Sequence, residues 1–369
     1  MKFERLEIRY VSLPLLYPWR TAYGADVEVD SVLLHVYSGS HDAWAETTPL
    51  RAPLYSPEFT RGVYVLLSEF LAPLLVGQEF ETADALMEVL RPFKGNPFAK
   101  AGLEMAWWML QARIEGRPLH ELLGGEQRDI EAGADFGIQD SIDMLLANIQ
   151  AAFDQGFKRV KLKFGPGWDL EMLKAVRSTF PTQVFHIDCN SAYTLDDLPM
   201  FREIDKMGLA MIEQPLYYND LLAHAELQKQ METPICLDES IKSVRDFEWA
   251  IRLGSCRVLN IKPPRVGGLS ASVTLHDMAR DAGIPCWVGS MLESGVGMGV
   301  LIELATLPNF TYPNDLFPSP RFYVQPLTKP VTAINEDCTF SPSTVPGIPY
   351  VPDPERLEET TRFKMVLEA

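Results

Sequence analysis

Five charged residues follow one another at a nearly constant spacing through the middle of the sequence. They are Lys163, Asp188, Glu213, Asp238 and Lys262, and their successive separations are 25, 25, 25 and 24 residues. Each stands at the end of a short apolar run. If these runs are the strands of a β/α barrel, their carboxyl ends converge on one mouth, where such barrels build their active sites. The spacing therefore predicts three carboxylates side by side, with a lysine on each flank.

Three ionised carboxylates at one mouth repel one another unless a cation neutralises them. Oxygen ligands of this kind suit a hard divalent cation, which favours Mg²⁺, with Mn²⁺ as a substitute. No His or Cys stands among the three acids, which disfavours zinc and copper. A single acid at a strand end is often only a solvated terminus, but three at equal spacing favour a site. Asp188, Glu213 and Asp238 are therefore the predicted metal ligands.

The lysines follow the same pattern. Lys161 and Lys163 are two residues apart, so a strand places both ammonium groups on one face, inside the barrel. Proximity of like charges and partial burial would both lower the pKa of a lysine toward the range of a base. Lys262 comes from another strand, on the far side of the acids. Two lysines on opposite sides of a metal suit proton removal beside a carboxylate, with the metal stabilising the enediolate.

The elements that must position these residues alternate from about residue 130 onward. Helical patterns separate the strands and include 142–155, 169–179, 198–206 and 244–253. No glycine-rich dinucleotide fingerprint follows the first strand, so a parallel barrel is favoured over an open sheet. The seven predicted strands are Ala132–Ile138, Arg159–Phe164, Val184–Asn190, Leu209–Gln214, Pro234–Glu239, Arg257–Lys262 and Pro285–Met291.

Three regions are predicted along the chain. Residues 1–125 place two strand-like runs before two helical ranges, 57–93 and 99–123, which indicates an α+β domain that caps the barrel. Residues 126–320 form the barrel. Residues 321–369 are rich in proline and are expected to be irregular chain packed on both the barrel and the cap.

Composition excludes several classes of protein. The 369 residues are 47% hydrophobic and 22% charged, as in an ordinary globular enzyme. With 33 basic and 50 acidic residues, the net charge of −17 argues against nucleic-acid and membrane partners. The apolar stretches 64–76 and 296–306 are too short to span a bilayer. Five cysteines without CxxC spacing, and no signal peptide, favour a reducing cytoplasm.

The sequence resembles the enolase superfamily, in its muconate-lactonising subgroup, and within it the o-succinylbenzoate synthase / N-succinylamino acid racemase family. The likeness extends over nearly the whole chain, including 102–125. The motifs that carry it are Lys161-Leu-Lys163, Asp188-Cys-Asn190, Glu213-Gln-Pro215, Asp238-Glu239-Ser240, Asn260-Ile-Lys262-Pro-Pro-Arg265-Val-Gly-Gly268 and Met291-Leu-Glu-Ser-Gly-Val-Gly297.

This resemblance implies a capping α+β domain over a modified (β/α)₇β barrel with Mg²⁺ held by the three acids. Lys163 would be the base in the dehydration that gives o-succinylbenzoate, a step in menaquinone synthesis, and Lys262 would stabilise the enediolate from the opposite face. In racemisation of an N-succinylamino acid the two lysines would take and return the α-proton. The resemblance also implies a small carboxylate substrate and a homo-oligomer. Supporting roles are implied for Lys161, Asn190, Glu239 and Arg265.

Substrate specificity is expected mainly from the cap. The segment Tyr17–Gly24, with Trp19, is predicted to be a lid loop over the substrate, and Tyr55 lies in a second loop that the family likeness places nearby. The implied substrate-binding residues are Trp19, Tyr55, Asp135, Ser290, Met291 and Leu292.

Two of these residues depart from the family pattern. A small hydroxyl residue is expected where Asp135 stands, and glycine where Ser290 stands. A carboxylate at 135 would repel a succinyl carboxylate unless it is paired. Other N-acylamino acids, a dipeptide whose ammonium group Asp135 binds, or a muconate-type lactone therefore remain alternative substrates for the same chemistry.

Overall fold

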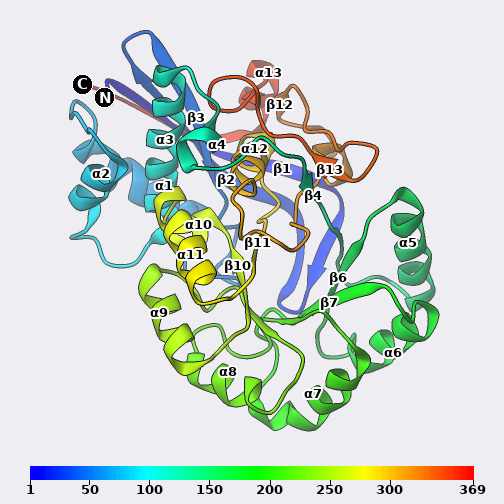
Figure 1. Ribbon diagram of the computed structural model, residues 1–369. Coiled ribbons are helices and arrows are strands. Elements are labelled where there is room, and N and C mark those ends of the chain that lie inside the picture. The colour runs from blue at the N-terminus through cyan, green and yellow to red at the C-terminus, as the bar shows by residue number, and fades with distance from the viewer.

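Both ends of the chain contribute to one antiparallel sheet in the computed structural model, which describes residues 1–369. Its strands are β1 (Arg5–Thr21), β2 (Gly24–Ser38), β3 (His41–Thr47) and β15 (Thr361–Glu368), in the order β15-β1-β2-β3. The two termini accordingly lie together in Figure 1. The expectation that the last residues are irregular is wrong for β15, which pairs with β1 and covers an edge that would otherwise expose unpaired backbone groups.

Helices cover this sheet and complete the predicted α+β cap. The long helix α3 (Pro97–Glu115) packs on β2 and β3. It approaches the sheet closely at Gly102, where a Cβ atom would lie 2.9 Å from Leu34 Cδ1. Gly116, with φ of 67°, ends it in the left-handed conformation. The other cap helices are α1 (Thr60–Leu66), η1 (Leu67–Leu71), η2 (Ala72–Leu74), α2 (Ala83–Leu90) and α4 (Leu119–Leu123).

Seven parallel strands form the second sheet, and neighbours in sequence are neighbours in space. This order confirms the predicted barrel, although each strand is shorter than the apolar run that predicted it. The strands are β5 (Ala134–Phe136), β6 (Arg159–Lys163), β7 (Val184–Asp188), β8 (Ile212–Glu213), β9 (Ile235–Leu237), β10 (Val258–Ile261) and β11 (Cys286–Val288).

Helices surround these strands, and Figure 1 shows α5 to α9 in an arc on the outside of the barrel. Their ends are set by local sequence: the Ser141 and Ser243 side chains cap α5 and α9, and left-handed Gly156 and Gly254 end them. The barrel helices are α5 (Ile142–Gln155), α6 (Leu170–Thr179), α7 (Leu198–Ile204), α8 (Leu221–Gln228), α9 (Val244–Leu253), α10 (Pro263–Val266), α11 (Leu269–Asp281) and α12 (Gly295–Leu304).

Short elements join these parts. Strand β4 (Ile130–Glu131) pairs with β13 (Thr339–Phe340), and β12 (Thr328–Lys329) pairs with β14 (Val351–Pro352). No helix has the length and apolar character needed to cross a membrane. The remaining elements are η3 (Leu195–Asp197), η4 (Asp205–Met207), η5 (Ser319–Arg321) and α13 (Pro354–Thr360).

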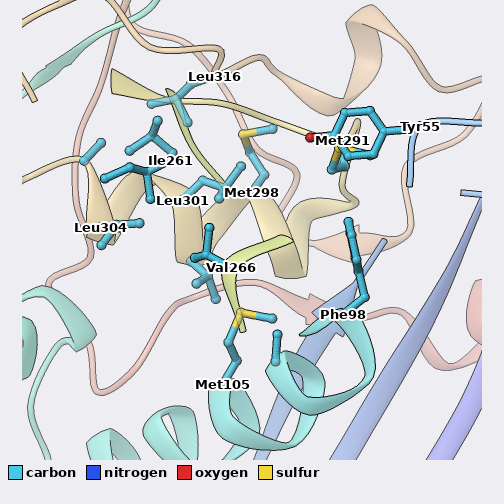
Figure 2. Packing of buried hydrophobic residues seen from close by; sticks show 14 of the residues in the cluster. Tyr55, Phe98, Met105, Ile261, Val266, Met291, Met298, Leu301, Leu304 and Leu316 are labelled. Atoms are coloured by element: carbon cyan, nitrogen blue, oxygen red, sulfur yellow. The ribbon is translucent and has the colours of Figure 1, made fainter. Parts of the chain in front are cut away.

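Cap and barrel share one apolar core and are joined by buried carboxylates. Figure 2 shows Met105 of α3 in the same cluster as Met298 of α12. Glu104 of the cap accepts hydrogen bonds from the first two backbone amides of α11, and Glu46 accepts one from within the first turn of α12. In the reverse direction, Glu303 of α12 accepts one from the backbone of α4. Carboxylates at helix N-termini are stabilising, and these three join the cap to the barrel.

Candidate active site

The parallel register of the barrel brings the predicted site residues together. Lys163 at the end of β6 is opposite Asp188 at the end of β7, and Asp188 is opposite Glu213 at the end of β8. Asp238 directly follows β9, and Lys262 directly follows β10. All five side chains are buried. Five residues spread over 100 positions of sequence thus meet at one barrel mouth.

Two lysines from β6 pair with the first two acids. Lys161 Nζ lies 3.0 Å from Asp188 Oδ2 and 2.9 Å from Glu213 Oε2. Lys163 Nζ lies 2.7 Å from Asp188 Oδ2 and 2.9 Å from Asn190 Oδ1. Burial alone would raise the pKa of Asp188, but Lys161 and Lys163 outweigh it and hold that pKa well below its usual range. Asp188 is therefore a carboxylate at neutral pH.

Lys262 pairs with the third acid from the opposite side of the mouth. Its Nζ lies 2.9 Å from Asp238 Oδ2 and 3.5 Å from Met291 Sδ. Oδ1 of Asp238 accepts hydrogen bonds from the Tyr55 hydroxyl, at 2.7 Å, and from the Arg265 guanidinium. Tyr55 comes from the cap, so the two domains meet at Asp238.

The expected lowering of the lysine pKa is not what this arrangement produces. Burial favours a lower pKa for Lys161, but Asp188, Asp315 and Glu213 outweigh burial and raise it. The pKa of Lys262 is also raised above its ordinary value, against the effect of burial. For Lys262 the groups that raise the pKa are Tyr55, Glu213 and Glu239. A divalent cation on those carboxylates would cancel the charge that keeps the lysines protonated.

The three acids suit a hard cation by their chemistry. They offer six oxygen atoms on three adjacent strand ends, and Oε2 of Glu213 is buried with the Lys161 ammonium, at 2.9 Å, as its ion-pair partner. His186 Nε2 lies 3.4 Å from that oxygen without a hydrogen-bond partner, and burial lowers the pKa of His186 to about 4. In the conformation described, no three acidic, histidine or cysteine side chains are close enough to hold a metal together, and Lys161 Nζ lies within 3.0 Å of both Asp188 and Glu213.

The residues implied as supporting lie around this centre. Asn190 donates from Nδ2 to Oε1 of Glu239, at 3.2 Å, while Oε2 of Glu239 is buried without a partner. Burial and the nearby Asp188 raise the pKa of Glu239 to about 7. Arg265 is fully buried, donates from Nε to the carbonyl of Ile241 at 2.8 Å, and lines a cavity on the far side of Tyr55. Arg265 and Glu239 therefore adjoin the acids rather than the active-site cavity.

The cavity above the acids lies between cap and barrel. Lys161, Lys163 and Lys262 line it, together with all six predicted substrate-binding residues, Trp19, Tyr55, Asp135, Ser290, Met291 and Leu292. Residues that the sequence analysis did not select complete its wall. They are chiefly Tyr23, Asp26, Leu50, Asp315, Phe317 and Phe322.

The predicted lid over Tyr17–Gly24 is a β-hairpin rather than a loop. Strand β1 continues to Thr21 and β2 begins at Gly24, so Trp19 pairs with Asp26 across the hairpin. The register is interrupted between Pro14 and Trp19. Trp19 is buried, and its ring meets Phe322 edge-on with centroids 5.3 Å apart. Trp19 thus enters the cavity wall from a paired strand.

Asp135 forms an ion pair within the protein. It is therefore not the unpaired carboxylate that was expected to repel a succinyl carboxylate. Oδ1 of Asp135 lies 2.6 Å from the buried Arg159 guanidinium, which also lies 2.8 Å from Oδ1 of Asp315. Lys161 Nζ lies 3.0 Å from Oδ2 of Asp315. Burial, and then the charge of Asp315, raise the pKa of Asp135 to about 7.

The sequence analysis missed both partners of Asp135. Arg159 carries a usable signal, since 159, 161 and 163 alternate along β6 and share a face. Asp315 lies outside the named strands and helices of the chain, so neither periodicity nor spacing indicates it.

Both the cap and the barrel of this chain match known families. A family model described as "Mandelate racemase / muconate lactonizing enzyme, N-terminal domain" matches residues 5–124, and one described as "Enolase C-terminal domain-like" matches residues 144–356. The chain is 42% identical over 329 residues to an N-succinylamino acid racemase of Thermus thermophilus, covering 89% of each protein. It is 38% identical over 364 residues to an o-succinylbenzoate synthase of Geobacillus kaustophilus, covering 98% of this chain and 97% of the relative.

A solved structure agrees as well. An enolase-superfamily protein of Listeria innocua superposes with a TM-score of 0.95 at 34% identity, covering 100% of this chain and 99% of the other. The matches include both the cap and the barrel, and they extend over the strand ends that carry the lysines and acids. The chain therefore belongs to the enolase superfamily, in the family whose curated members are named o-succinylbenzoate synthase and N-succinylamino acid racemase.

Proposed function

We propose that this protein is a Mg²⁺-dependent o-succinylbenzoate synthase that also racemises N-succinylamino acids. One observation carries the proposal: Lys163 and Lys262 line one cavity from opposite sides of the three acids. A carbon acid held between them exposes one face to each lysine. Relatives with either activity in their names share 37–42% of their residues with this chain.

In the synthase reaction the substrate is 2-succinyl-6-hydroxy-2,4-cyclohexadiene-1-carboxylate. Lys163 removes the proton on the carbon beside the carboxylate, and the protonated Lys262 stabilises the enediolate from the other face. Loss of the hydroxyl group, which leaves with that proton as water, makes the ring aromatic. Mg²⁺ bound by Asp188, Glu213 and Asp238 would supply positive charge to the developing dianion.

In the racemase reaction the same two lysines act in turn. One takes the α-proton of the N-succinylamino acid, and the other returns a proton to the opposite face. Both steps need one neutral and one protonated lysine at a time. Lys163 lies against Asp188 and Lys262 against Asp238, and both lysines line the cavity in which the substrate would be held.

A dipeptide epimerase is the second candidate, because Asp135 lies on the cavity wall where a substrate ammonium group would meet a carboxylate. An L-Ala-D/L-Glu epimerase of Bacillus subtilis is 26% identical to this chain. The ion pair between Asp135 and Arg159 already uses that charge, so the first candidate is favoured.

We expect Mn²⁺ to substitute for Mg²⁺, the chain to form a homo-oligomer, and the protein to reside in the cytoplasm. All five cysteines are free and buried, as suits a reducing compartment. The net charge of −17 disfavours nucleic acid and anionic membranes as partners.

The deciding measurement is the dehydration reaction followed by ultraviolet absorbance, with Mg²⁺ and with EDTA. We expect rapid turnover with Mg²⁺, none with EDTA, and none for folded Lys163→Ala or Lys262→Ala. Turnover that persists in EDTA would refute metal dependence. No turnover while Mg²⁺ is demonstrably bound would refute the synthase, and α-proton exchange on acylated amino acids and dipeptides would then identify the substrate.

A further inference from the structure

One wall of the active-site cavity has a strained backbone. Ser290, Met291 and Leu292 form this wall, directly after the last barrel strand. Leu292 has φ of 58°, in the left-handed region that a leucine rarely occupies. A conformation of this kind persists only where surrounding contacts impose it.

Hydrogen bonds hold the wall in this conformation. The backbone N–H of Leu292 donates to Oγ of Ser290 at 2.8 Å, and the carbonyl of Leu292 accepts from the Tyr323 hydroxyl. The Ser290 hydroxyl in turn donates to Oε2 of Glu293 at 2.8 Å. The N–H of Met291 donates to the same Oε2 at 2.9 Å. One carboxylate oxygen therefore anchors the two residues that precede Leu292.

Glu293 itself does not line the cavity. Its side chain is 1% exposed and packs beneath the wall, where a Cβ atom on Gly297 would lie 2.5 Å from Glu293 Cβ. Oε2 makes the two bonds described, while Oε1 is buried without any hydrogen-bond partner. A buried carboxylate that uses only one oxygen is costly for stability alone, which points to a role in holding the wall.

The wall in turn contacts a catalytic lysine. Met291 Sδ lies 3.5 Å from Lys262 Nζ. At Gly289 a Cβ atom would lie only 2.7 Å from Lys262 Cε and 2.2 Å from Asn260 Oδ1. The chain therefore packs against Lys262 without space between them, and a displaced wall would displace the ammonium group. Neither Lys163 nor Lys161 has a hydrogen bond to this segment.

We propose that Glu293 is a positioning residue for the reaction: through Ser290 and the Met291 amide it holds the wall that places Lys262. The inference rests on the proposed function, in which Lys262 serves one face of the substrate and Lys163 the other. Loss of the anchor should therefore impair proton transfer on one face more than on the other. A role confined to stability would affect both faces alike.

The test measures α-proton exchange with solvent deuterium by ¹H NMR, separately for the two enantiomers of N-succinylphenylalanine with Mg²⁺. Lys163→Ala first identifies the enantiomer that Lys262 deprotonates, as the one that still exchanges. We expect Glu293→Ala to slow exchange of this enantiomer about tenfold more than exchange of the other, because small displacements of reacting groups cost large factors in rate. Glu293→Gln, whose amide oxygen accepts both hydrogen bonds, should restore the wild-type ratio of the two rates.

Glu303→Ala is the matched control, because Glu303 is equally buried and accepts two backbone N–H groups far from the cavity. It should lower the melting temperature and leave the ratio unchanged. If Glu293→Ala does not fold, Ser290→Ala removes one link and should shift the ratio in the same direction. An unchanged ratio in the folded variant, or a Gln variant as impaired as Ala, would overturn the inference. A wild-type enzyme that exchanges neither enantiomer would instead refute the racemase activity on which it rests.

Discussion

The hydroxyl of Tyr55 donates a hydrogen bond of 2.7 Å to Oδ1 of Asp238. Tyr55 belongs to the cap and Asp238 to the barrel, and both side chains are buried. The Tyr55 ring also lies beneath Lys262, with Nζ 4.6 Å from its centroid. A single aromatic residue of the cap thus orients an acid and a lysine of the barrel.

Replacing Tyr55 with Phe should weaken Mg²⁺ binding about tenfold, because hydrogen bonds to a ligating carboxylate orient it toward its metal. The ring and its contact with Lys262 are retained, so the fold should be unchanged. Isothermal titration with Mg²⁺ measures the affinity. Tyr217→Phe, at an exposed tyrosine, is the control. Equal affinity in Tyr55→Phe and wild type would show that Tyr55 does not orient the acid.

Mg²⁺ should raise the melting temperature, and EDTA should reverse the rise. Asp188, Glu213 and Asp238 are buried together at the barrel mouth, where a cation would relieve their mutual repulsion. A cation that binds only the folded state stabilises it by about 2.7 kcal/mol at one hundred times its Kd. Differential scanning fluorimetry at constant ionic strength measures the shift. Asp188→Asn should lose most of it. A shift of the same size in that variant would place the bound cation elsewhere.

Replacing Asp135 with Ser should increase the preference for succinyl over acetyl substrates about tenfold, which corresponds to about 1.4 kcal/mol. Without Asp135, Arg159 keeps only Asp315 as an acidic partner, so this wall of the cavity should attract a succinyl carboxylate more strongly. Because burial raises the pKa of Asp135 to about 7, the carboxyl gains charge as pH rises through neutrality. In the wild type this preference should therefore fall between pH 6 and 8, and the variant should lose that pH dependence.

Rates with N-succinyl and N-acetyl forms of one amino acid measure the preference as a ratio of kcat/KM. Asp143→Ser, at an exposed acid of α5, is the control and should behave as wild type. A ratio that is the same in Asp135→Ser and wild type at every pH would remove Asp135 from the determinants of specificity.

His224 should make the protein less stable in acid. Burial lowers the pKa of His224 to about 4, below its ordinary value of 6.5, because Nε2 accepts the Leu216 N–H and must stay unprotonated. The unfolded chain then binds one more proton than the folded chain between pH 6.5 and 4. The folded state therefore loses stability as pH falls through this window, by about 3 kcal/mol in total.

Urea unfolding at several pH values measures this effect. His224→Gln removes the titration and should flatten the slope of unfolding free energy against pH in that window, whereas the exposed His41→Gln should not. If His224→Gln has the wild-type slope, another group accounts for the loss of stability.

The architecture and the central charges followed from local patterns. The α+β cap, the barrel and the order of its strands were predictable because hydrophobic periodicity is a short-range property and parallel strands must be joined by helices. Lys163, Asp188, Glu213, Asp238 and Lys262 were predictable because each closes a strand, and strand ends in a barrel share a mouth. The strand β15 was missed for two reasons. It pairs with the first half of β1, which lies some 350 residues away in the sequence, and most of its own residues are exposed.

The sequence by itself determined that the three acids and the two lysines reach the barrel mouth, since the alternation of strand and helix puts each of them at a strand end. Only the tertiary structure decided how they are paired. Arg159 neutralises Asp135 and Asp315, and Glu293 anchors the wall beside Lys262. Asp315 and Glu293 have no common spacing or periodicity, because a buried charge or amide takes whichever group folding brings within hydrogen-bond distance, wherever that group lies in the chain.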